Sequence, residues 1–155
     1  MSFEVFIDHS QSSPVIILKD LTNNTSAEIY AFGGLLNAFT ISKDGKNANF
    51  VAGFDSVDDA KLNITNGFKS AKLSPFVCRM AAGKFDWDED TYHVEKFFLG
   101  KHAIHGIVYD EVYQIQSTRA DGNSACVELF YAYPGFERLI TMFEYNPSGM
   151  PRRRS

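Results

Sequence analysis

The fold class is decided most clearly by residues 84–97, which read Lys84-Phe85-Asp86-Trp87-Asp88-Glu89-Asp90-Thr91-Tyr92-His93-Val94-Glu95-Lys96-Phe97. Successive side chains of a strand point to opposite faces, so Phe85 and Trp87 share one face of the first run. Tyr92, Val94 and Lys96 share one face of the second run. Two alternating runs joined by a short acidic turn predict an antiparallel hairpin.

Turn-forming residues divide the rest of the chain into short runs of strand character. We expect further strands at 4–8, 15–20, 27–32, 36–42, 49–52, 108–118, 125–133 and 139–145. Imperfect alternation in the run 108–118 predicts a bulge or a bend. One short helix is expected, capped by Ser56 and followed by an acidic first turn. Many short strands with so little helix predict an all-β fold, either an antiparallel β-sandwich or a barrel.

Composition and charge are those of one globular domain. The chain has 155 residues, of which 45% are hydrophobic, 22% charged and 14% aromatic. It holds 15 basic and 19 acidic residues, and three of the basic ones are Arg152, Arg153 and Arg154. An acidic body is poorly suited to a phosphate backbone, so we expect no nucleic-acid partner.

The ends of the chain and the cysteines indicate location and domain limits. No secretion signal follows Met1 and no run is apolar enough to span a bilayer, so we expect a cytoplasmic protein with no membrane partner. Cys78 and Cys126 are expected to be reduced thiols of the core, inside strands. Pro147, Pro151 and the arginines cannot extend a sheet, so the β domain is predicted to cover 1–145 and a tail 146–155.

Two features of the sequence are candidates for a metal-binding or ligand-binding site. His102 and His105 lie between Gly100 and Gly106, either as a metal pair without a third ligand nearby or as one solvated and one hydrogen-bonded histidine. Arg79 follows an apolar run. Its stem either covers apolar surface while its head reaches water, or its guanidinium presents fixed donors to ligand oxygens. The residues alone leave both alternatives open.

Several segments together resemble the aldose 1-epimerase (galactose mutarotase) family, over about 29–145. The resemblance rests on 71–80, on Gly83-Lys84-Phe85 with Tyr92 and Val94, on Gly100-Lys101-His102-Ala103-Ile104-His105-Gly106, on 33–36 and 50–55, and on Tyr133-Pro134-Gly135. Cys78 replaces an Asn that many members have before the Arg, and Ile107 replaces a second Gly after the His. These two departures bear on substrate preference.

The resemblance implies a fold, an activity and two site residues. The fold would be part of a galactose mutarotase-like supersandwich, and the family interconverts α and β anomers of aldoses without metal or cofactor. Arg79 and His105 match the positions that bind and orient the monosaccharide, an aldohexose. The family's general acid His and general base Glu would align beyond Tyr145, so no catalytic residue is assigned here.

Three expectations follow for this chain. It is a truncated relative of the family and is inactive on its own, because it lacks both proton-transfer groups. The alternative is a non-catalytic carbohydrate-binding β-sandwich. Exposed sheet edges would favour self-association.

Overall fold

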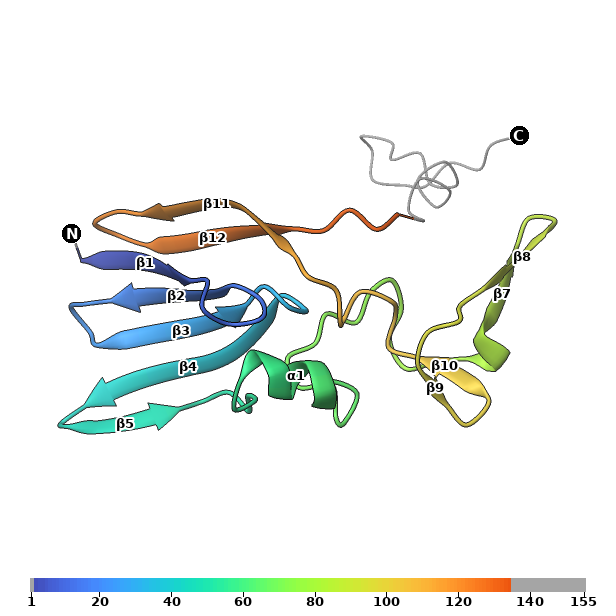
Figure 1. Ribbon diagram of the computed structural model, residues 1–155, viewed down its shortest axis with the longest axis horizontal. Helices are drawn as coiled ribbons and strands as arrows, with labels where there is room; N and C mark the ends of the chain where they lie inside the picture. The colour runs from blue at the N-terminus through green and yellow to red at the C-terminus, as the bar shows by residue number, and fades with distance from the viewer. Residues whose placement is uncertain (1, 135–155) are drawn as a thin grey trace.

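Five strands that follow one another in the chain form the largest sheet (Figure 1). The computed structural model describes residues 2–134. The strands are β1 (Phe3–Asp8), β2 (Val15–Asp20), β3 (Thr25–Tyr30), β4 (Leu35–Lys43) and β5 (Lys46–Asn49). Each pairs antiparallel with the next, as the predicted alternation requires.

One face of this sheet carries the core. Val15 and Tyr30 from the sheet are 2% and 3% exposed, and they cluster with Val57 and Ala60 of α1 (Val57–Asn63). The side chain of Ser56 accepts a hydrogen bond from the backbone N–H of Asp59 at 3.0 Å, so the predicted helix and its cap are confirmed. The short helix is stabilised by burying its apolar side against the sheet.

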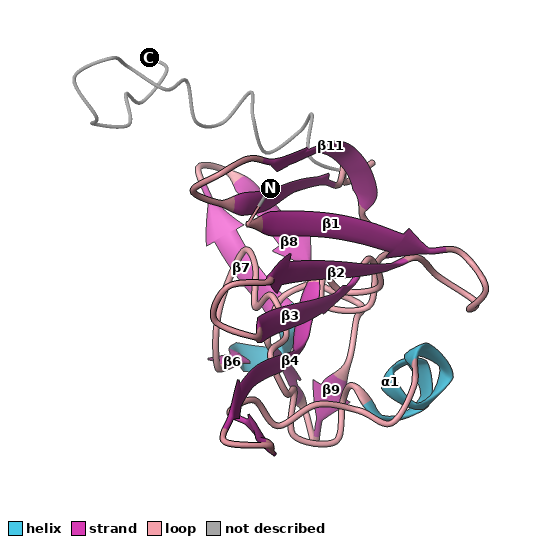
Figure 2. Ribbon diagram, turned by 90° about the vertical axis from the view of Figure 1, so that its left-hand side faces the viewer, coloured by secondary structure: helices cyan, strands magenta, loops and turns pink. Residues whose placement is uncertain are grey.

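The other face lies against a second hairpin, formed by β11 (Gln114–Ala120) and β12 (Ala125–Phe130). Figures 1 and 2 both place this hairpin beside β1. Leu18, Ala27 and Phe39 from the sheet and Ala125 from β12 line a hollow of about 200 Å³ between the two. The described chain is therefore an antiparallel β-sandwich, as expected. The bulge predicted in this region lies between Ile115 and Ser117.

The remaining elements form a separate group of short strands. They are β6 (Arg79–Met80), the 3-10 turn η1 (Ala81–Gly83), β7 (Lys84–Trp87), β8 (Asp90–His93), β9 (Phe98–Leu99) and β10 (His102–Ile104). The hairpin of β7 and β8 confirms the first prediction, and the paired Phe85 and Tyr92 rings stack with centroids 5.2 Å apart. The return strand ends at His93, so Val94 and Lys96 do not extend it as expected.

Two predicted strands begin furthest from the position that the structure shows. The strand expected at 49–52 is β5, which begins at Lys46 directly after a turn in which Asp44 and Gly45 both have positive φ. Every residue of β5 is exposed, so it carries no apolar alternation that sequence could reveal. The strand expected at 108–118 begins only at Gln114, because the preceding backbone instead bonds to the turn 31–33.

The predictions for the cysteines and for the C-terminal strands have mixed outcomes. Both cysteines are free as predicted, but both are exposed, so their placement in the core is wrong. Cys126 lies on the outward side of the alternation in β12, and Cys78 precedes β6 with φ of 59°. The strand expected at 125–133 ends at Phe130, whereas the strand at 139–145 and the tail 146–155 lie outside the described residues. None of the helices described in 2–134 has the length and apolarity needed to cross a membrane.

Candidate functional site

Antiparallel pairing brings the backbone segments of the two predicted site residues side by side. Arg79 of β6 pairs with Ile104 of β10, so His105 directly follows the partner of Arg79. The backbone N–H of His105 donates to the carbonyl oxygen of Cys78 at 3.1 Å. Residues 26 positions apart in the sequence are thereby held within one ladder step of each other.

Arg79 is exposed at the first position of β6. Within residues 2–134 its guanidinium makes no hydrogen bond and no ion pair. A guanidinium presents five N–H donors in a planar fork that suits ligand oxygens. An exposed guanidinium of this kind fits both alternatives left open by the sequence, a head that reaches water and a fork of donors for ligand oxygens.

His105 is half-buried and its ring is fixed on two sides. The ring packs edge-on against Phe68, with centroids 4.6 Å apart, and Phe68 in turn contacts Tyr109 in the core. His105 Nδ1 accepts a hydrogen bond from the backbone N–H of Cys78 at 3.3 Å. When Nδ1 accepts, the proton of a neutral imidazole is on Nε2, which becomes a donor.

Gly106 makes the close approach of this segment possible. Its φ is +80°, and a Cβ built there would lie 2.1 Å from the carbonyl oxygen of Ser74. Any side chain would push away the loop that leads into Arg79. The Gly in the His-Gly pair is therefore a geometric requirement of the site.

His102 occupies the other end of β10 and is also half-buried. Its Nδ1 accepts a hydrogen bond from the backbone N–H of Ala82 at 3.4 Å. In the part of the chain that the structure describes, no three His, Cys, Asp or Glu side chains gather as a metal site would require. Both histidines instead use a ring nitrogen to bind backbone.

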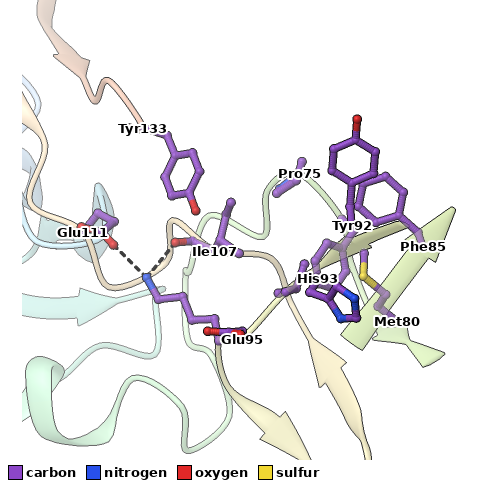
Figure 3. Close-up of a pocket in the computed structure, with 12 residues that line it drawn as sticks. Pro75, Met80, Phe85, Tyr92, His93, Glu95, Ile107, Glu111 and Tyr133 are labelled. Carbon is purple, nitrogen blue, oxygen red and sulfur yellow. Dashed lines mark hydrogen bonds and ion pairs between the residues drawn. The ribbon is translucent and has the colours of Figure 1, made fainter. Parts of the chain in front are cut away.

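A pocket that the sequence did not predict adjoins this region (Figure 3). Its volume is about 440 Å³. Phe85 and Tyr92 lie on one side, and Glu111 and Tyr133 on the other. Met80, the neighbour of Arg79, also lines it. Its walls come from segments spread between residues 75 and 133, so no local pattern could reveal it.

Lys96 joins segments of one wall of this pocket through hydrogen bonds and ion pairs. Its Nζ donates to the carbonyl oxygen of Ile107 at 2.7 Å and to Glu111 Oε1 at 2.8 Å, and lies 2.5 Å from Asp110 Oδ1. Burial opposes the charge of Lys96, but the bonds to both carboxylates outweigh it and raise its pKa. Burial likewise disfavours charged Glu111, yet bonds from Lys96 and Tyr131 lower its pKa. Both groups are charged at neutral pH.

Comparisons with known proteins agree with this architecture. The family model described as aldose 1-epimerase matches residues 15–144. The solved galactose 1-epimerase from Lactobacillus acidophilus NCFM superposes with a TM-score of 0.64 at 18% identity, a likeness of fold. The aligned region covers 86% of this chain and 39% of that epimerase. Among curated proteins, none matches this sequence.

Proposed function

We infer that this chain acts on aldoses, because it belongs to the aldose 1-epimerase family, whose match spans residues 15–144. The activity proposed for the whole protein is the interconversion of α and β anomers of an aldohexose of the glucose or galactose type. The part proposed for the described residues is to bind and orient the sugar through Arg79 and His105.

Interconversion of anomers requires two proton transfers. A base takes the proton from the anomeric hydroxyl while an acid protonates the ring oxygen, and the ring C–O bond breaks. The aldehyde then rotates and the ring closes on the other face, returning both protons. Groups that hold the sugar in place lower the barrier by fixing its oxygens relative to the acid and base.

Arg79 and His105 fit the task of holding the sugar. The guanidinium of Arg79, which has no partner among residues 2–134, can donate charge-assisted hydrogen bonds to hydroxyl oxygens. Nε2 of His105 can donate to the ring oxygen or a hydroxyl, because Nδ1 is occupied by the Cys78 N–H. The observation that supports the proposal is the β6–β10 pairing, which holds the backbones of Arg79 and His105 within one ladder step of each other.

The binding role is tested by replacing the charge of Arg79. We expect Arg79→Gln to weaken galactose binding by roughly tenfold, because a hydrogen bond from a charged donor contributes about 1.5–3 kcal/mol. Binding is measured by saturation transfer from protein to sugar protons. Arg119→Gln, on exposed β11, is the matched control and should leave binding unchanged. Equal binding by the Arg79→Gln variant and the unmodified chain would contradict the assignment.

Catalysis by these 155 residues alone is a separate question. The family resemblance implies that the proton-transfer His and Glu align beyond Tyr145, and each such group contributes roughly 10²–10⁴-fold to rate. We therefore expect the isolated chain to leave the mutarotation of fresh α-galactose at the buffer rate in polarimetry. A rate that rises in proportion to protein would contradict this expectation.

The second candidate function is non-catalytic carbohydrate binding. It is supported by the same backbone pairing of the segments that carry Arg79 and His105, with no proton-transfer pair assigned beside them. Sugar binding together with an unchanged mutarotation rate supports it for the isolated chain. Sugar binding with accelerated mutarotation rejects it.

A further inference from the structure

Two imidazoles bind the backbone at both ends of the strand that carries Arg79. His105 Nδ1 accepts from the N–H of Cys78, which directly precedes Arg79, at 3.3 Å. His102 Nδ1 accepts from the N–H of Ala82, three residues after Arg79, at 3.4 Å. The two histidines are three residues apart on the neighbouring chain segment and so span the whole of β6.

The strand between them has little else to hold it. β6 contains only Arg79 and Met80, and strands of this length have few ladder bonds. The residues that flank it, Cys78 and Ala82, have φ of 59° and 52°, a conformation that non-glycine residues adopt only when the surroundings impose it. Each of these two residues turns the chain, and each has its N–H bound by an imidazole.

We propose that His102 is a positioning residue for Arg79, holding the end of β6 that His105 does not reach. This inference rests on the proposed function, in which Arg79 binds the sugar. His105 has a place in the sugar site itself, whereas His102 acts only through the backbone. The His-x-x-His spacing could suggest a metal site. Here it provides one hydrogen-bond acceptor at each end of a two-residue strand.

The proposal fixes the protonation of His102. Nδ1 can accept the Ala82 N–H only when it carries no proton, so the neutral ring has its proton on Nε2. An imidazolium, with protons on both nitrogens, cannot make this bond. The ¹⁵N shift of Nδ1 distinguishes the two forms directly and requires no substitution.

The proposal also ranks replacements of His102. The side-chain oxygen of Asn can occupy about the position of Nδ1, whereas Leu offers no acceptor at all. We expect His102→Leu to shift the backbone amide resonance of Arg79 and to weaken galactose binding about three- to tenfold, as the loss of one hydrogen bond implies. His102→Asn should restore both to within about twofold of the unmodified chain. His9→Leu, on an exposed loop after β1, is the control and should change neither.

The test has outcomes that separate this inference from the proposed function. NMR first gives the His102 tautomer at neutral pH, and then the Arg79 amide and the galactose titration in each variant. The inference is supported if Nδ1 carries no proton, if the Arg79 amide resonance shifts in His102→Leu, and if it returns in His102→Asn. The inference is overturned if Nδ1 carries a proton or if the Arg79 amide resonance does not move in His102→Leu. It is also overturned if His102→Asn shifts the amide and weakens galactose binding as much as His102→Leu does. Absence of galactose binding in the unmodified chain overturns the proposed function, while the tautomer and the amide still decide the role of His102.

Discussion

The five-stranded sheet and the region around Arg79 are built by different means. In the sheet, residues such as Ile16 and Leu35 are fully buried, and the only non-glycine residues with positive φ, Asn24 and Asp44, lie in turns. In 68–105 six non-glycine residues have positive φ, among them Cys78, Ala82 and His105. Burial of alternating side chains therefore makes the scaffold, whereas backbone contacts in unusual conformations make the candidate site.

Because the two regions are stabilised differently, different substitutions should disturb each of them. A scaffold held by burial tolerates changes at its surface and fails when its interior is altered. A site held by close backbone approaches fails locally when one of these is blocked, while the scaffold persists. Substitutions in the two regions should therefore differ in how far their effects extend.

The largest effect is expected at Asn37, the buried polar residue that joins the sheet to the segment before α1. Its Nδ2 donates to Glu28 at 2.9 Å and to the carbonyl oxygen of Phe54 at 3.1 Å, and its Oδ1 accepts from the Phe54 N–H at 2.7 Å. Asn37→Leu leaves several of these groups buried without partners and should lower the free energy of unfolding by about 3 kcal/mol. Urea denaturation measures it.

The control for this substitution is Asn47→Leu on the exposed strand β5. It should change the free energy of unfolding by less than about 0.5 kcal/mol. Similar losses for the two variants would show that Asn37 does not join these segments.

An intermediate effect is expected at Gly106, and it should stay local. Gly106→Ala places a methyl group against the backbone of Ser74, so we expect a cost of about 2 kcal/mol and displaced resonances for His105 and Cys78. The resonances of β1 to β4 should not move. NMR spectra of the variant check both expectations.

Gly100→Ala is a closely matched comparison. Gly100 also has positive φ, at 63°, but nothing lies within 4 Å of its Cβ position. Its variant therefore carries the cost of backbone conformation without the clash. If the two alanine variants perturb His105 equally, the close approach of Gly106 to Ser74 does not hold the site.

The smallest effect concerns the ion pairs of Lys96. Burial works against charged Glu111, but hydrogen bonds from Lys96 and Tyr131 lower the pKa of its carboxyl in the folded state. Its contribution to stability is therefore present above the ordinary value of 4.5 and is lost as pH falls through the folded value. For a partly exposed pair we expect less than about 1 kcal/mol.

The substitution Glu111→Gln should remove this part of the acid dependence. Glu4→Gln, exposed on β1, should leave it as in the unmodified chain. Urea denaturation repeated between pH 3 and pH 7 measures the difference. Identical pH profiles for the two variants would show that the pairing with Lys96 contributes nothing.

The sequence predicted what depends on local alternation and missed what depends on long-range contacts. The strands at 15–20 and 84–87, and the cap at Ser56, follow from neighbours in the chain and were confirmed. Strand β5 was misplaced because both its faces are exposed. The pocket lined by Phe85 and Glu111 was missed because its walls meet only after folding.

The resemblance to the family supplied what the residues alone could not. A lone arginine and a pair of histidines left two alternatives open at each position. The match over residues 15–144 shows the family, and the pairing of β6 with β10 brings the segments of Arg79 and His105 together. Their role in binding sugar, and the expected self-association of the chain, stay predictions.

If Arg79 and His105 bind one sugar together, a galactose titration followed by NMR should detect the sugar at both side chains. We expect the Arg79 Nε–H and the His105 Nε2 resonances to shift along one binding curve, and we expect Arg79→Gln to flatten the curve for His105. Joint binding is contradicted if the two resonances shift with different midpoints in galactose concentration. It is also contradicted if galactose binds saturably and neither resonance shifts.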